Sequence, residues 1–439
     1  MIEAHGLGGG ADLPIPADLA IAGGTAALTL SFAVLLMAWR EPRFDSGRGL
    51  WKVDGRFAGV VDGRVFAVVL RVAGALFFLF ALWAALAGPD VLINPVFGIV
   101  YVWLWVGLVP ASLLFGRFYR AVNPARTIYL VLTRLSGDRE GRGLREYPSR
   151  LGYWPAVLAL FAFVWLELVY PDATYLGSLR LWFALYFVIV VVGALVFGEK
   201  WISRADPFEV YSDLVAHLSI WGRTERGELV VMSPLRNLAR IAPEPGLVGA
   251  VAVLLGSTAY DSYRESTSWI RFVQSTEQNV MLLSTCLLVV AVLVVGVTFT
   301  LATMATGTAG GAVSRREIPA RMAHSIVPLV VGYMVAHYLT FLFEVGQMTL
   351  IQMSDPMGTG ANLFGTANWQ INYWLSQNPT VLASIKVLAI VTGHVLGVVA
   401  AHDRALQLLP RKHQVTGQLP LLAAMVLYTF GGLYLLFGT

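Results

Sequence analysis

The chain has 439 residues, of which 57% are hydrophobic and only 13% are charged. Because soluble domains carry about 25% charged residues, this composition excludes an ordinary soluble protein and predicts an all-α integral membrane protein. A formal net charge of +4 does not indicate nucleic-acid binding, because the basic residues lie in short stretches between apolar segments. The single cysteine, Cys286, excludes a disulfide within the chain.

Runs of about 20 apolar residues predict ten membrane-spanning helices. The N-terminal stretch has no basic residue before its first apolar run, so we expect no cleaved signal peptide. The sixth predicted span is the shortest. In chain order the ten cover residues 17–39, 64–87, 95–116, 152–170, 177–198, 246–262, 279–304, 319–344, 380–402 and 417–437.

The distribution of Lys and Arg predicts the orientation of these spans, because short basic loops remain cytoplasmic. The loops around Asp90 and Asp172 are almost free of basic residues, and only Arg264 and Arg271 violate alternation across ten spans. This pattern predicts a bacterial cytoplasmic (inner) membrane protein with both termini outside. The basic connections lie at residues 40–56, 117–150, 200–240, 315–321 and 404–412.

An internal duplication relates residues 64–136 to residues 146–219. Several features recur at one offset of 82 residues, and each copy continues into an Asn-Pro or Asp-Pro pair that is typical of a helix start. Each unit is therefore predicted to be a transmembrane hairpin followed by a cytoplasmic helix. The matched pairs are Trp83 with Trp165, Asp90 with Asp172, Gly116 with Gly198, and, one residue out of step, Asn123-Pro124 with Asp206-Pro207.

The two cytoplasmic helices, TIYLVLTRL and FEVYSDLVAHL, alternate apolar and polar positions at helical spacing. Such helices usually lie in the headgroup plane; docking of a soluble or membrane-complex partner is the alternative. A competing partition into inverted halves rests on Pro110 and Pro328, which fall at corresponding positions of the third and eighth spans.

Residues 315–347 contain the most informative span. It carries His324, His337 and Glu344 within or at the edge of an apolar run interrupted by Pro328. Ionisable side chains are costly in hydrocarbon, so several in one span indicate a functional site. The alternative is that each histidine merely bonds to a neighbouring helix.

Helical spacing places Tyr333, His337 and Glu344 on one face, since seven residues at about 100° each bring Glu344 to within about 20° of His337. His324 precedes His337 by thirteen residues. It therefore faces nearly the opposite side unless a proline bends the helix.

The ninth span adds Lys386, His394 and His402, and its Gly393 and Gly397 form a GxxxG pair that permits close helix approach. Antiparallel packing of the eighth and ninth spans would bring Lys386 near Glu344 or His337 and set His324 near His402. Lys386 either pairs with a carboxylate or extends outward to the headgroups.

Three uses of these residues remain open. Titratable groups staggered in depth suit ion or proton translocation of an unknown solute, with Tyr333, His337, Glu344, Lys386 and His394 lining the pathway. His324 and His402 are candidate ligands for a transition metal or haem in a membrane-embedded enzyme. The third use is as an assembly or scaffold subunit.

Residues 279–437 form the predicted functional half, and the outer loop 346–379, which has no Lys or Arg, is expected to cover the external mouth of the bundle. The whole chain is treated as one polytopic domain that contacts the lipid bilayer.

The segments HSIVPLVVGYMVAHYL, GHVLGVVAAHDRAL and the FG…DPFEVYS element resemble a group of actinobacterial multi-pass proteins, some of which carry the label fenitrothion hydrolase. That resemblance implies organophosphate hydrolysis, which normally uses a metal-activated water. Only the scattered histidines are available as its ligands.

Overall fold

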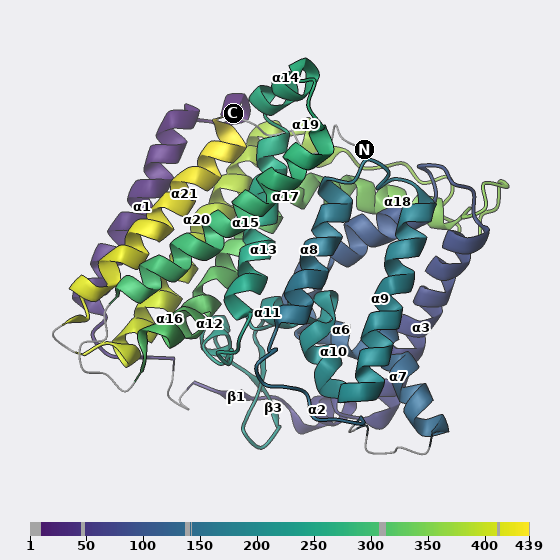
Figure 1. The fold of residues 1–439 in the computed structure, drawn as a ribbon, viewed down its shortest axis with the longest axis horizontal. Helices are drawn as coiled ribbons and strands as arrows, with labels where there is room; N and C mark the ends of the chain where they lie inside the picture. Colours follow the sequence, from purple (N-terminus) through teal and green to yellow (C-terminus); the bar gives the residue numbers. More distant parts are fainter. Residues whose placement is uncertain are drawn as a thin grey trace. The chain divides into compact units, whose positions relative to one another are not determined.

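The computed structural model describes residues 10–44, 49–136, 141, 143–306, 313–410 and 413–438. Within them the chain is mainly helical, with three short strands (Figure 1). Seven of the described helices are long and apolar enough to cross a membrane, and the bent pair Pro95–Val106 and Leu108–Phe115 makes an eighth if it is counted as one span. These helices indicate a multi-pass membrane protein.

All ten predicted spans are helical, but two of them are not among the helices that are long and apolar enough to cross a membrane. Helix α8 (Trp154–Leu168) has only 15 residues. Helix α13 (Leu247–Arg264) has 18 residues, most of them buried, and carries Asp261 and Arg264 in its last turn. The number of ten spans and their orientation therefore stay predictions. Residues 45–48, 137–140, 142 and 411–412 of the basic connections lie outside the described residues.

Contacts divide the chain into two compact units. Unit 1 draws its described residues from Met1–Gly47, Leu238–Phe341 and Tyr373–Thr439. Helix α1 lies beside α20 and α21, and α13 packs against α15 and α17 (Figure 1). The main helices of unit 1 are α1 (Ala17–Ala38), α13, α15 (Val280–Ala305), α17 (Val327–Thr340), α20 (Pro379–Leu408) and α21 (Leu419–Phe437), with the shorter η2 (Gly10–Asp12), α14 (Thr267–Ser275), η4 (Arg315–Glu317), α16 (Ile318–Met322), η5 (Ala323–Ile326), α19 (Trp374–Gln377) and η8 (Thr416–Gln418).

Glycines bring α17 and α20 into backbone contact. A Cβ added to Gly393 would lie 2.5 Å from the carbonyl oxygen of Pro328, and one added to Gly332 would lie 2.6 Å from that of Ala389. Gly397 likewise faces the carbonyl oxygen of Ser325. The partner positions fall along one helix as they rise along the other, so the helices are antiparallel and the close approach predicted from the GxxxG pair is confirmed.

The eighth predicted span is not one continuous α-helix. The 3-10 turn η5 precedes Pro328, which lies in the first turn of α17, where a proline costs no hydrogen bond. A π-helical segment, η6 (Phe341–Val345), ends α17, and α18 (Gly346–Met353) follows directly. Each interruption changes the direction of the side chains that follow it.

Unit 2 contains residues Arg48–Asn237 and Leu342–Asn372. A small antiparallel sheet in the order β1-β3-β2 accompanies its helices. Its elements are α2 (Gly55–Val61), α3 (Arg64–Ala87), α4 (Pro95–Phe97), the π-helix η3 (Gly98–Val106), α5 (Leu108–Phe115), α6 (Phe118–Val122), α7 (Pro124–Leu135), α8, α9 (Leu176–Phe197), α10 (Glu199–Ala205), α11 (Pro207–Ala216), α12 (Pro234–Leu238, ending in unit 1), α18, and strands β1 (Trp51–Lys52), β2 (Trp221–Arg223) and β3 (Leu229–Val231).

The two predicted helix starts at Asn123 and Asp206 are confirmed. Each side chain accepts hydrogen bonds from two backbone N–H groups of the helix that it begins, and Asn123 also donates to Asp206 Oδ2 at 2.8 Å. Gly116 and Gly198, which end the preceding spans, both have positive φ angles, 69° and 71°. Residues 64–136 and 146–219 thus share these two local features, while their origin by duplication stays a prediction.

The outer loop begins later than predicted. Residues 346–353 are helical, and Gly346, Thr349 and Met353 of this helix, α18, are buried. Thr349 packs where a Cβ on Gly98 would stand, 2.0 Å from its Oγ1, so α18 rests on η3 within unit 2. The irregular stretch is therefore shorter than 346–379, and the cover that it was expected to form stays a prediction.

We expect Gly393→Ala to destabilise the protein by about 1–3 kcal/mol, because the added methyl group meets backbone atoms of α17 that cannot move independently. Gly431→Ala is the matched control, since nothing lies within 4 Å of its added Cβ. Thermal unfolding in detergent, followed by tryptophan fluorescence, measures both. Equal unfolding temperatures for the two variants would contradict the packing described for α17 and α20.

Candidate functional site

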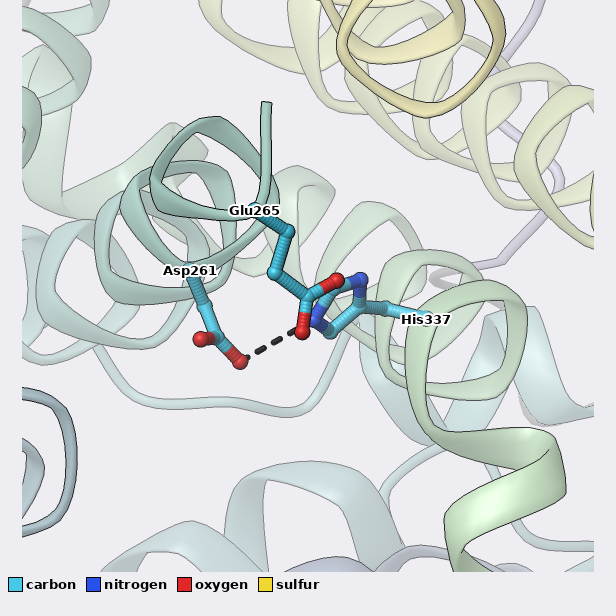
Figure 2. Close-up of side chains that lie close together, drawn as sticks. All are labelled: Asp261, Glu265 and His337. Carbon is cyan, nitrogen blue, oxygen red and sulfur yellow. Dashed lines mark hydrogen bonds and ion pairs between the residues drawn. The ribbon is translucent and has the colours of Figure 1, made fainter. Parts of the chain in front are cut away.

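The side chains of Asp261, Glu265 and His337 converge inside unit 1, where α13 meets α17 (Figure 2). His337 Nε2 lies 3.0 Å from Asp261 Oδ2, and the hydroxyl of Tyr338 donates to the same oxygen at 2.6 Å. The His337 and Asp261 side chains are only 1% and 3% exposed. Because a carboxylate only accepts, Nε2 of His337 carries a hydrogen and donates it.

Asp261 keeps a permanent cationic partner from its own helix. Arg264 Nε donates to Asp261 Oδ1 at 2.9 Å, three residues further along α13. Both carboxylate oxygens are therefore paired whichever charge His337 carries. This matters because a buried carboxylate without a partner is strongly destabilising.

The second ring nitrogen of His337 bonds to a hydroxyl that has a choice of partner. Ser262 Oγ lies 3.2 Å from His337 Nδ1 and 3.1 Å from the carbonyl oxygen of Thr258. When Ser262 donates to Nδ1, His337 is neutral; when Ser262 donates to Thr258, Nδ1 must carry its own hydrogen. Rotation of one hydroxyl therefore lets the site hold His337 with or without an extra proton, leaving no buried ring nitrogen unpaired in either state.

Two further ionisable groups extend this cluster. Glu265 follows the last turn of α13, one turn beyond Asp261. Lys386 of α20 is buried and interacts electrostatically with Glu265 and with Asp12 of η2. Glu265 in turn interacts with His337, Asp261 and Arg264. Three helices of unit 1 thus contribute charges to one network.

Burial raises the pKa of Glu265 to about 7, and the charge of Asp261 adds to the rise. His337, Arg264 and Lys386 act in the opposite direction. Glu265 therefore holds a proton in the folded protein at pH values where an unfolded glutamate has lost it. This contribution to stability is fully present below about pH 4.5 and is lost as the pH rises through about 7.

Asp261, Glu265 and His337 are also the one group of three side chains among the described residues that could hold a metal ion. Their ligand atoms all lie within 4.8 Å of one another. Carboxylate and imidazole ligands suit zinc and other transition metals. However, an ion at Nε2 must displace its hydrogen bond to Asp261, and Arg264 and Lys386 already supply positive charge. The arrangement fits a proton more closely than a resident metal.

Tyr333 of α17 and His394 of α20 contact each other. Neither takes part in the hydrogen bonds described above for Asp261, His337 and Glu265, which we call the Asp261 cluster. Their ring centroids are 6.4 Å apart in an edge-on arrangement. His394 Nδ1 donates to the carbonyl oxygen of Ile390 at 2.9 Å, so Nε2 is an acceptor, and it has no hydrogen-bond partner among the described residues. His394 is 1% exposed, which makes this orphaned nitrogen unusual.

The role of His324 and His402 as a metal-ligand pair stays a prediction, and the observed partners of both imidazoles are oxygen atoms. Both ring nitrogens of His402 face oxygen acceptors, Gln418 Oε1 at 2.8 Å and the carbonyl oxygen of Trp39 at 2.9 Å. His324 Nδ1 lies 3.1 Å from the carbonyl oxygen of Arg321. Hydrogen bonding of the imidazoles to nearby oxygens explains their burial, as the simpler reading of a helix-bundle histidine expects.

The predicted position of Glu344 on the face of His337 rested on regular α-helical geometry. It assumed 100° per residue, but the π-helical segment Phe341–Val345 intervenes and turns by a smaller angle. Glu344 is buried and belongs to the part of the chain grouped with unit 2. Its pairing with His337 or Lys386 stays a prediction, whereas Asp261 and Glu265 are the acidic neighbours observed for those residues.

Sequence patterns did not point to Asp261 and Glu265. Asp261 lies at the end of the short sixth span and Glu265 just beyond it, and because they are four residues apart they share one helix face. Acidic residues at the end of a span are commonly read as solvated. One signal in the sequence could have indicated them: Asp261 and Glu265 lie close to Arg264, which violates the alternation of basic loops.

Comparisons with protein-family models, with curated proteins and with solved structures find no match to this chain. The geometry of the site therefore carries the functional argument alone.

We expect an infrared pH titration to show a carboxylic-acid band that disappears as the pH rises through about 7, because Glu265 loses its proton there. Glu265→Gln should abolish the part of this band that titrates at about 7, whereas the part from Asp206, whose pKa burial raises to about 6, should remain. Glu317→Gln is the control and should leave the band unchanged. Glu317 is exposed, and hydrogen bonds from Ser314 and, to a smaller extent, from Arg321 lower its pKa. A band that titrates at about 7 and persists in Glu265→Gln would assign the titration to another group.

Proposed function

We propose that the protein translocates protons across a membrane, with the Asp261 and His337 pair as the group that takes up and releases the proton. The single observation that carries this proposal is the hydrogen-bond choice of Ser262, which satisfies both protonation states of His337. A buried group that changes charge without losing its partners is what a proton carrier requires. Coupling of this movement to an unknown solute is part of the proposal.

Staggered groups along α20 support a path for the proton. Lys386, His394 and His402 are all buried and follow one another at intervals of eight residues, a rise of about 12 Å per step. The antiparallel register sets Lys386 close to the level of His337 and sets His394 one step deeper. A step of this length exceeds one hydrogen bond, so water or a change in conformation must complete it.

The topology proposed for this activity is ten spans in a bacterial inner membrane with both termini outside. The basic connections support it, as do the helical segments found at all ten predicted positions. In this orientation the Asp261 cluster lies toward the outer side, because α13 is the sixth span and the cluster is at its end. The alternative role as an assembly or scaffold subunit does not require a titratable pair.

A second candidate function is hydrolysis by a metal-activated water. It rests on the three ligand atoms of Asp261, Glu265 and His337 and agrees with the resemblance to proteins labelled fenitrothion hydrolase. In that case a divalent ion replaces the hydrogen between His337 and Asp261, and the organophosphate would be the substrate.

Proton flux into proteoliposomes tests the leading proposal. With a pH-sensitive dye inside and a potassium diffusion potential across the membrane, the wild-type protein should acidify the lumen faster than empty liposomes. Asp261→Asn and His337→Gln should each reduce the rate at least tenfold, because each removes a member of the proton-holding pair. His217→Gln is a matched control that changes a buried histidine of unit 2, outside the proposed proton path.

Wild-type flux equal to that of empty liposomes, or full flux in both Asp261→Asn and His337→Gln, contradicts proton translocation.

Elemental analysis of the same preparations distinguishes proton translocation from metal-dependent hydrolysis. One equivalent of zinc, iron or manganese per chain that is lost in His337→Gln supports the hydrolase instead. Size-exclusion chromatography confirms that each variant is folded before either result is interpreted.

A further inference from the structure

A cavity of about 710 Å³ lies within unit 2, between α3, η3 with α5, and α9. Its volume falls within the range of about 300–1,000 Å³ that is typical of ligand sites. The cavity is partly open to the surroundings of the protein. A molecule of the bilayer can therefore enter it.

The walls of the cavity are apolar and follow the direction of the spans. Phe77, Trp103 and Phe183 contribute aromatic rings from three different helices. On α3 the lining extends from Ala73 to Leu86, a rise of about 20 Å, which is most of the roughly 30 Å thickness of a bilayer core. The cavity thus accepts a long, flexible and apolar molecule lying along the bilayer normal.

Helix α3 has little packing of its own to hold it in place. No residue in its most apolar 18-residue window is buried, and Ala84 is its only buried residue. An apolar occupant between α3 and its neighbours supplies contacts that the chain itself does not.

One end of the cavity is closed by polar side chains that are already satisfied. Tyr119 and Tyr186 line it there, and the hydroxyl of Tyr186 donates to Asp206 Oδ2 at 2.8 Å. Asp206 is held in turn by Asn123, which also donates to Glu209. This end therefore receives the apolar terminus of an occupant and not its headgroup.

The other end carries a cation. Arg180, in the first turns of α9, lines the cavity and donates from Nε to the carbonyl oxygen of Ala85 at 2.6 Å. Among the described residues Arg180 has no ion pair. Its two terminal nitrogens remain for an anionic group at the mouth, and a guanidinium matches the geometry of phosphate.

We propose that this cavity is a binding site for one phospholipid, with an acyl chain between α3 and α9 and the phosphate on Arg180. The length and apolar lining of the cavity favour an acyl chain, and the charge of Arg180 favours a phosphate over an uncharged headgroup. This site is independent of the proton-holding cluster of unit 1, so either proposal can fail alone.

Native mass spectrometry of the full chain, purified in detergent and supplied with phosphatidylglycerol, tests the proposal. The wild type should retain one phospholipid per chain. Ala81→Phe and Ala111→Phe, which add a ring to the cavity lining, should reduce the retained fraction at least tenfold. Ala87→Phe is the matched control on α3, since Ala87 is exposed and does not line the cavity.

Arg180 is tested with the same assay. Arg180→Gln should lower retention several-fold, and Arg180→Lys, which keeps the charge, should restore most of it. The proposal is overturned if the wild type retains no phospholipid, if a neutral isoprenoid is retained in its place, or if Ala81→Phe and Ala87→Phe behave alike. Monodisperse elution of each variant establishes that retention, and not folding, has changed.

Discussion

Everything proposed for unit 1 depends on one constraint: a charge buried among apolar helices must keep a partner in every state that it occupies. Asp261 meets this constraint through Arg264 on one oxygen and through His337 and Tyr338 on the other. Because Arg264 stays in place, His337 can change its charge without isolating the carboxylate. The Ser262 hydroxyl supplies the remaining adjustment.

The two units solve the problem of buried polar groups in different ways. In unit 2, Arg126 donates to Glu209 from Nε at 2.6 Å and from a terminal nitrogen at 2.5 Å, and the network fixes the starts of α7 and α11. Burial raises the pKa of Asp206 to about 6 even so, since Glu209 is close and opposes its ionisation. That network is closed and structural, whereas the cluster of unit 1 contains a hydroxyl with two alternative acceptors.

Periodicity and residue type predicted much of the fold. Apolar runs located all ten helical segments, the Asx-Pro pairs located two helix starts, and the GxxxG pair located the contact of α17 with α20. They failed where the local helix type changes. No sequence rule predicted the π-helical segment that contains Glu344, so the rotation from His337 to Glu344, calculated at 100° per residue, was wrong. They also failed for Asp261, because its partner lies 76 residues away on another helix, a contact that spacing within one element does not reveal.

The most direct measurement is ¹⁵N nuclear magnetic resonance of histidine-labelled protein in lipid nanodiscs, with the His337 signals assigned by difference from His337→Gln. The account predicts that Nε2 of His337 stays protonated at every pH at which the protein is folded, while Nδ1 gains and loses its proton. A ring locked in one state across that range, or an Nε2 that carries no proton, would contradict the role assigned to the Asp261 and His337 pair.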